Sequence, residues 1–337
     1  MIWLTHPHAN AYFLLPWLFL LAERLCRRGR LVDVAGLGAV SGLTWLGGHP
    51  HAAIIVGLPV VAWVGFRLAS AGLPSGVAWR RVALATGAAI LGLALGAIML
   101  VPFFEALGHA TQTSRGTPPF ELSAGLAFLF PEFWDRPDRF LSEGFGGPVN
   151  FSERTGYLGA VPTLLAIGGL VCRRPRGPHL FVGLLLAVGL LIAFDSGPVA
   201  SAVREVPVLS QVNLLRVLIV VSFAGALSAA YGLQRLLDGS GRERRRMLVA
   251  GSVLALVPPL VWLGGHPSAI ADTGDALRAS LESGIGLTTE QVELWAVIRW
   301  LVVGSAAAAI IALLARRSRH AGLAAGVAIG LTAVDPS

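Results

Sequence analysis

Charged residues are scarce in this chain of 337 residues, because Asp, Glu, Lys and Arg together make up only 13% of it. Soluble domains carry about 25% charged residues, so the composition excludes an ordinary water-soluble globular fold. Hydrophobic residues account for 55% of the chain, and the mean hydropathy is +0.70. A chain of this composition needs the bilayer as its solvent, and we expect an integral membrane protein.

Lysine is absent, and the 26 basic residues, all arginines, give a formal net charge of +7. This charge does not indicate a nucleic-acid partner, because most of the arginines cluster between apolar runs. The clusters lie at residues 24–30, 67–81, 173–176, 235–246 and 316–319. Short basic loops stay on the cytoplasmic side during insertion. All five clusters fall on that side if the N-terminus lies outside, so the charge predicts topology.

Cysteine is rare too, and the two present, Cys26 and Cys172, fall at predicted cytoplasmic helix ends. Thiols in that compartment stay reduced. A disulfide and a cysteine-based metal site are therefore not expected.

Long apolar runs are what the chain has in abundance. A membrane-spanning helix needs about 20 mostly apolar residues. The candidate segments are 10–25, 32–48, 52–69, 82–104, 155–172, 179–195, 214–235, 247–265, 296–315 and 320–334. Pro16 is expected to kink the first of them, and Gly92 and Gly96 form a GxxxG pair suited to close helix packing. We predict an all-α, polytopic bundle of about ten spans, with residues 1–337 as a single transmembrane domain.

Two long segments between spans, residues 105–154 and 266–295, fall on the outer side, together with most of the 19 acidic residues. The first contains aromatic residues that suit short amphipathic helices in the membrane interface: Phe128, Phe130, Phe133, Trp134 and Phe140. Long irregular loops are more often functional than idle. Within the spans, Asp33, Arg216 and Arg299 fall near segment ends and no ionisable residue near a middle, which disfavours an ion-coupled transporter.

One short motif occurs twice, as WLGGHPHA at residues 45–52 and as WLGGHPSA at residues 262–269. Glycine terminates helices and proline cannot continue them, so each copy predicts a helix stop. The first copy also brings His49 and His51 to the outer face near the N-terminal His6 and His8. A histidine metal site is the alternative there, but no HxxxH or HxxE spacing supports one. We favour a polar or capping role and assign no metal ligands.

Three stretches in order carry a resemblance to a known family. They are LPWLFLLAERL with LTWLGGHPHAAI in residues 15–54, FPEFWDRP with GPVNFSERTGYLGAVPTLLA in residues 130–166, and VPVLSQVNLLRVLIVVSFAGALSAAYGLQRL in residues 206–236. Together they resemble the YfhO-type bacterial membrane proteins, which belong with the GT-C glycosyltransferase-like superfamily. The family pattern falls on Gly48, His49 and Pro50, on Asn150, Phe151 and Glu153, and on Tyr157 and Gly159. Of the paired arginines frequent in the family, Arg216 is present and Asn213 stands at the other position.

The resemblance implies a membrane protein of the bacterial plasma membrane that transfers a sugar from a polyprenyl-phosphate-linked donor to a glycan or lipid of the cell envelope. Its partners would be the bilayer, that donor and that acceptor. The leaving lipid phosphate needs arginine or a metal ion, and a divalent metal is one candidate cofactor. The candidate substrate-binding residues are His49, His51, Asn150, Glu153, Arg154, Tyr157 and Arg216.

The chain departs from the GT-C pattern at its start. These enzymes carry a catalytic Asp or Glu in the outer loop after their first helix, whereas this sequence opens MIWLTHPHAN and enters an apolar run at once. We therefore assign no catalytic residue and expect the acidic residue upstream of this chain. The alternative is a non-enzymatic flippase or accessory subunit for lipid-linked sugars, which would use the same outer basic residues without a catalytic carboxylate.

Overall fold

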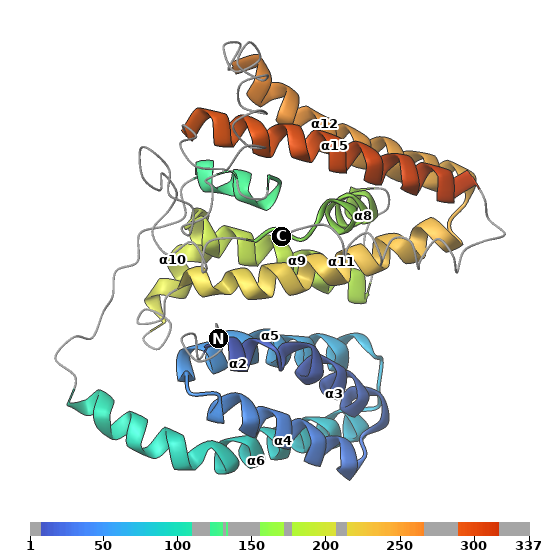
Figure 1. The fold of residues 1–337 in the computed structure, drawn as a ribbon. Coiled ribbons are helices and arrows are strands. Elements are labelled where there is room, and N and C mark those ends of the chain that lie inside the picture. Colours follow the sequence, from blue (N-terminus) through green and yellow to red (C-terminus); the bar gives the residue numbers. More distant parts are fainter. Residues whose placement is uncertain are drawn as a thin grey trace. The chain divides into compact units, whose positions relative to one another are not determined.

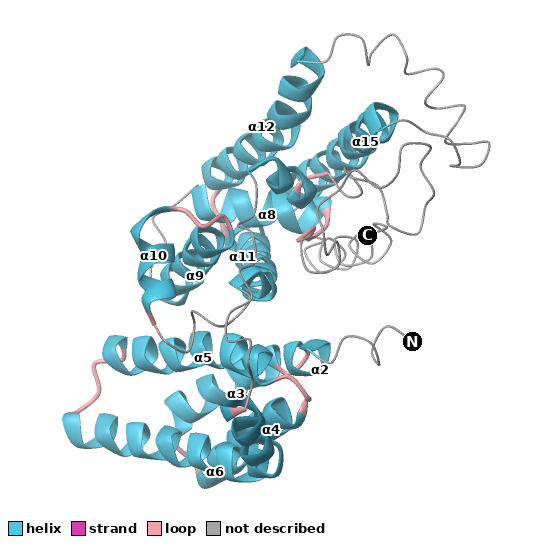
Figure 2. Cartoon of the chain, turned by 90° about the vertical axis from the view of Figure 1, so that its left-hand side faces the viewer, coloured by secondary structure: helices cyan, strands magenta, loops and turns pink. Residues whose placement is uncertain are grey.

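The computed structural model describes residues 8–109, 122–130, 133, 156–171, 177–206, 214–265 and 289–316. All regular structure in these ranges is helical, as Figures 1 and 2 show, and the predicted all-α class is confirmed. Contacts between residues divide the chain into two compact units. Unit 1 is Met1–Pro118 with Ala187–Val220, and unit 2 is Pro119–Leu186 with Val221–Ser337.

The helices of the described chain have the following bounds. Unit 1 contains α2 (His8–Tyr12), α3 (Leu15–Arg28), α4 (Leu31–Leu46), α5 (Pro50–Ser70), α6 (Ser75–Gly108), α10 (Gly197–Glu205) and the 3₁₀ turn η3 (Leu214–Val217). Unit 2 contains the 3₁₀ helix η1 (Leu122–Phe128), α8 (Ala160–Val171), α12 (Gly241–Gly265) and α15 (Thr289–Arg316). The unit boundaries fall within α9 (Pro178–Ala193) and α11 (Leu218–Asp238).

Among the described residues, five helices are long and apolar enough to cross a membrane, and the pair α9 and α10, bent by 74°, adds a sixth if it forms one broken span. Large apolar side chains point outward from them, such as Ile98 at 80% exposure and Val61 at 69%. By length and composition the chain is a multi-pass membrane protein. Helices cover the first nine of the ten predicted segments, and the tenth, 320–334, lies outside the described residues.

Pro16 shapes the first segment as its chemistry requires. The segment is split into α2, which ends at Tyr12, and α3, in which Pro16 is the second residue. Proline has no N–H to donate to the carbonyl four residues earlier, and that carbonyl is the one of Tyr12. The predicted effect of Pro16 on the helix is confirmed, and instead of a kink it is a break between α2 and α3 just before the proline.

The first copy of Gly-Gly-His-Pro begins where a helix ends. In this copy α4 ends at Leu46, and Gly48 has a φ of 86°, a conformation that glycine adopts without strain. Pro50 is then the first residue of α5. The predicted helix stop is confirmed for this copy. In the second copy Gly264 and Gly265 are still helical residues of α12, and the following residues lie outside the described chain, so the helix stop there stays a prediction.

Glycines allow α4 and α6 to lie very close together in unit 1. A Cβ built on Gly92 would lie 2.6 Å from the Cβ of Ser41, and one built on Gly96 would lie 2.6 Å from the Cβ of Trp45. Real Cβ atoms do not approach other carbons so closely. The predicted packing role of the GxxxG pair is thus confirmed, and α6 contributes the two glycines to it.

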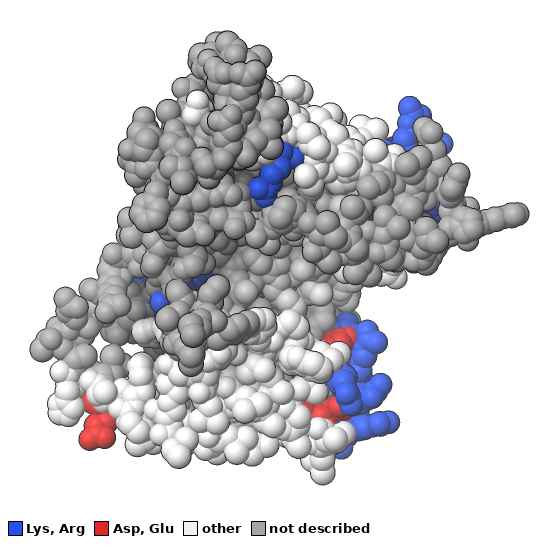
Figure 3. Space-filling view, viewed as in Figure 1, with Lys and Arg blue, Asp and Glu red and all other residues white. Residues whose placement is uncertain are grey.

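One end of the α3–α6 bundle gathers the arginines, and we call it the arginine end. Arg67 at the end of α5 forms two hydrogen bonds with Glu23 of α3, with lengths of 2.8 and 2.9 Å. Arg81 of α6 donates to the carbonyl of Cys26 in α3. Figure 3 shows basic and acidic side chains together at this end of the unit, with uncharged surface along the helices. The first two arginine clusters therefore share one side, as the topology requires.

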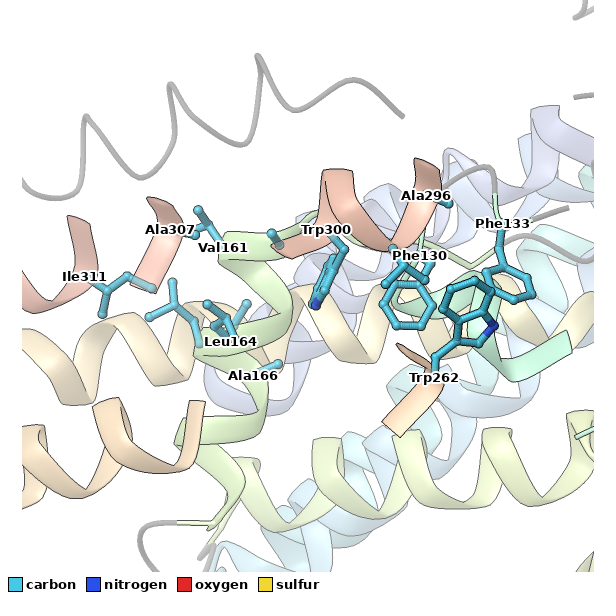
Figure 4. Packing of buried hydrophobic residues seen from close by; sticks show 14 of the residues in the cluster. Phe130, Phe133, Val161, Leu164, Ala166, Trp262, Ala296, Trp300, Ala307 and Ile311 are labelled. Carbon is cyan, nitrogen blue, oxygen red and sulfur yellow. The ribbon is translucent and has the colours of Figure 1, made fainter. Parts of the chain in front are cut away.

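Unit 2 is built around an aromatic cluster, and it corrects one expectation for the loop 105–154. Phe130 is 0% exposed and Phe133 is 2% exposed, because they pack against Trp300 of α15 and Trp262 of α12. Figure 4 shows these four rings side by side. Phe130 and Phe133 are thus core residues rather than interface residues, since covering the ends of α12 and α15 buries more of each ring than an interface does.

Arg299 lies within α15. The sequence placed it near the end of a span that begins at residue 296, and α15 begins at Thr289. The polar residues Gln291 and Glu293 belong to the same helix, so the helix extends beyond the predicted span on the side of Arg299. The expectation that no ionisable residue lies near the middle of a span stays a prediction for Arg299.

Candidate functional site

Two of the candidate site residues meet at the end of unit 1 opposite the arginine end. His49 lies in the turn between α4 and α5, and Arg216 lies in η3, just before α11. The Nη1 atom of Arg216 is 2.7 Å from the Nε2 atom of His49. Both side chains are half-buried. The fold thus joins the Gly-His-Pro motif to the arginine that the family resemblance singled out.

His49 is also the N-cap residue of α5. Its Nδ1 accepts a hydrogen bond of 3.2 Å from the backbone N–H of Ala52, which lies in the first turn of the helix. Pro50 follows at the first helical position, where its missing N–H costs nothing. The motif therefore ends one helix and starts the next, and it holds the imidazole ring in a fixed orientation.

The two contacts of His49 place opposite demands on its ring. A neutral imidazole has one N–H and one nitrogen lone pair. With the proton on Nδ1, Nε2 accepts from Arg216, and the N–H of Ala52 keeps the carbonyl of His49 at 3.0 Å as its acceptor. With the proton on Nε2, Nδ1 accepts from Ala52 and caps the helix. The Nε2–H of His49 and the Nη1–H of Arg216 are then two donors that point toward the same space. An anionic oxygen there would accept from His49 and Arg216 together.

Further rings surround this pair. The ring centroid of His8 in α2 is 5.8 Å from that of His49, and the centroid of His51 is 5.6 Å from it on the other side. His51 in turn meets Phe103 of α6 edge-to-face at 6.2 Å. The sequence predicted that His49 and His51 lie near the N-terminal histidines, and this is confirmed for His8, while His6 lies outside the described residues. The sequence did not predict Phe103 as a neighbour of these histidines, because no local pattern distinguishes it from the other apolar residues of α6.

Burial lowers the pKa of His49 from its usual 6.5 to about 4, with the Arg216 guanidinium as the second cause and the rings of His51 and His8 after it. His49 is therefore neutral at neutral pH, and the positive charge of the site is that of Arg216. The N-terminus of α5, with its partial positive charge, adds to this charge at the same point. The arrangement is suited to a ligand with an anionic oxygen.

The remaining candidates are Tyr157, Asn150, Glu153 and Arg154. Tyr157 lies in unit 2, where its ring packs against Trp300 at a centroid distance of 6.1 Å and contributes to the aromatic core. Asn150, Glu153 and Arg154 lie outside the described residues. Within the described ranges, no group of three or more His, Cys, Asp or Glu residues is arranged to hold a metal ion.

No known protein family matches the chain, and neither a curated protein nor a solved structure shows significant similarity to it. The resemblance to the YfhO-type proteins therefore stays a prediction that is based on the three motif stretches. The geometry of the site stands independently of it.

Proposed function

We propose that this chain is a GT-C-like membrane glycosyltransferase of the bacterial plasma membrane with about ten spans. It would transfer a sugar from a polyprenyl-phosphate-linked donor to a glycan or lipid of the cell envelope at the outer face. The observation that carries the proposal is the contact of Arg216 with His49 at the N-terminus of α5. A guanidinium, an imidazole that offers an N–H in one of its two tautomers, and a helix N-terminus converge there, and all three favour a phosphate group.

The reaction requires a cation at the leaving group. The acceptor hydroxyl attacks the anomeric carbon of the donor sugar, a new glycosidic C–O bond forms, and the bond from that carbon to the phosphate oxygen breaks. The electron pair leaves with polyprenyl phosphate, and the hydroxyl proton passes to a carboxylate base. Arg216 would stabilise the charge that develops on the phosphate. The base is unassigned, and Glu153 is a candidate substrate-binding residue that the described structure does not contain.

Donor binding and transfer can be measured separately. The purified full-length protein is reconstituted in liposomes with a radiolabelled polyprenyl-phosphate hexose, and both the bound donor and the sugar passed to an envelope-glycan acceptor are counted. We expect Arg216→Gln to reduce donor binding at least tenfold. Arg80→Gln is the matched control, because it removes the same charge at the arginine end, where Arg80 is exposed. It should leave binding unchanged.

The outcomes separate the two functions. Binding that depends on Arg216, together with sugar transfer by the purified protein, supports the glycosyltransferase. Binding that depends on Arg216 without transfer, also in the presence of added divalent metal, supports a flippase or accessory subunit. Equal donor binding by the wild type, Arg216→Gln and Arg80→Gln would overturn the assignment of the site.

A further inference from the structure

A large apolar cavity of about 620 Å³ lies in unit 1, and neither Arg216 nor His49 lines it. Its walls are α5 and α6, and residues of α4 and α3 lie behind it. Ligand pockets in proteins usually measure about 300–1,000 Å³, so the space is of ligand size. No charged residue lines it, and its polar lining consists of Ser41, Thr44 and Thr86. The Thr44 hydroxyl already donates to the carbonyl of Val40 at 2.8 Å.

The cavity opens sideways. Its floor consists of buried residues such as Leu18 and Ala88, whereas Val61 and Leu93, which line it too, are 69% and 46% exposed on the outside of the bundle. Both helices that bear the exposed lining residues are candidate membrane spans. The opening therefore lies along the helices, where a membrane-embedded protein is surrounded by hydrocarbon.

Two glycines of α5 leave this space open. Gly57 and Gly65 line the cavity, and a Cβ built on either would meet no atom within 4 Å. Neither has the positive φ that favours glycine, and neither lets another helix come closer, in contrast to Gly92 and Gly96. Glycine inside a helix is less favourable than alanine. These two glycines are thus best explained by the room that they leave beside α5.

We propose that this cavity binds one acyl chain of a membrane phospholipid, which enters sideways between α5 and α6. The wall supplies dispersion contacts, and its few hydroxyl groups offer a polar ligand or a peptide backbone much less hydrogen bonding than such a ligand would need. Phospholipid chains are the molecules present in bulk at the opening, so they fill the space without a delivery step. The proposal does not depend on sugar transfer, because neither Arg216 nor His49 takes part in it.

The test compares phospholipid that stays bound to the purified full chain. The protein is washed extensively in a mild detergent, and the phospholipid per chain is measured by phosphate analysis and lipid mass spectrometry. Gly57→Leu places a side chain in the cavity and should remove one phospholipid per chain. Gly87→Leu is the matched control, because Gly87 of α6 also faces open space but does not line the cavity. It should retain the wild-type amount.

Two further measurements keep the outcome decisive. Gly65→Leu fills the same cavity at a second point and should reproduce the loss, also if Gly57→Leu folds poorly. Thermal unfolding is measured for all variants, and we expect the filled variants to be at least as stable as Gly87→Leu. Equal phospholipid in the wild type, both filled variants and the control would overturn the proposal. So would the finding that the lipid lost on filling is a polyprenyl lipid rather than a phospholipid.

The proposal and the sugar-transfer function can fail separately. Arg216→Gln should retain the phospholipid although it binds less sugar donor. Gly57→Leu should lose the phospholipid, irrespective of how much sugar donor it binds. Loss of the phospholipid in Arg216→Gln to the same extent as in Gly57→Leu would contradict a separate acyl-chain site.

Discussion

Arg216 and His49 are 167 residues apart in the chain, and the guanidinium Nη1 lies 2.7 Å from the imidazole Nε2. This contact links η3 to the turn that starts α5. His49 is oriented by the helix that it caps, so the position of its Nε2 does not depend on a flexible loop. The site is thus built on helix ends, which are among the more rigid places for a functional group.

The first prediction concerns pH. The pKa of His49 is about 4 in the folded protein and 6.5 when unperturbed, so the unfolded chain binds a proton first as the pH falls. Stability is therefore full above pH 6.5 and is lost progressively as the pH falls from there to about 4. The charged and titratable groups around the ring are Arg216, His51 and His8, and a protonated His49 would be repelled by Arg216.

His49→Asn isolates this effect, because asparagine is a good N-cap residue and does not titrate. We expect the wild type to lose on the order of 1–3 kcal/mol more stability than His49→Asn between pH 6.5 and 4. Thermal unfolding in detergent across this range measures the difference. The other histidines titrate in both proteins, so identical pH profiles would contradict the shift assigned to His49.

The second prediction concerns the ion pair between Glu23 and Arg67. Both side chains are about one-fifth exposed, at 21% and 20%, and Arg67 also lies over the ring of Trp63, 5.6 Å from its centroid. Glu23→Gln leaves the half-buried guanidinium without its carboxylate partner and should cost about 1–3 kcal/mol of stability. Arg28→Gln removes an exposed charge at the same end and should change stability by less than about 0.5 kcal/mol. Chemical or thermal unfolding measures the stability of the two variants. Equal losses of stability would show that the ion pair contributes no more than a surface charge.

The third prediction concerns the close approach of α4 and α6. Gly96→Ala brings a Cβ to 2.6 Å from the Cβ of Trp45, which is part of a stiff side chain near the backbone. The helices must separate, at a cost of about 1–3 kcal/mol. Gly87→Ala on the same helix meets nothing within 4 Å and should be neutral or slightly stabilising. A lower melting temperature for Gly87→Ala than for Gly96→Ala would refute the packing role.

The fourth prediction concerns the aromatic core of unit 2. Trp300 is 1% exposed and touches the rings of Phe130 and Tyr157. Trp300→Ala should destabilise the protein by about 3–5 kcal/mol. Trp79→Ala serves as the control, because Trp79 is 72% exposed. Unfolding measurements and the yield of folded protein in detergent should separate the two variants, and similar losses would argue against a buried role for Trp300.

Several features of this protein follow from local sequence, and the structure confirms them. The scarcity of charge and the long apolar runs predict a helical membrane protein, because hydrocarbon requires every backbone hydrogen bond to be made within the helix. The helix break before Pro16 and the end of α4 before Gly48 also follow, since the conformational limits of proline and glycine act within a few residues. The number of ten spans and the YfhO resemblance stay predictions.

Features that depend on distant parts of the chain were decided by the tertiary structure. The sequence named His49 and Arg216 separately, but only folding brings η3 onto the turn before α5. The burial of Phe130 differs from expectation, because helix packing overrides the local pattern of hydropathy. The spacing of Gly57 and Gly65 puts them near one face of a helix, yet whether that face packs tightly or leaves a cavity depends on where α6 lies. Local chemistry determined the helices and their ends, and long-range packing decided which of them meet and what space remains between them.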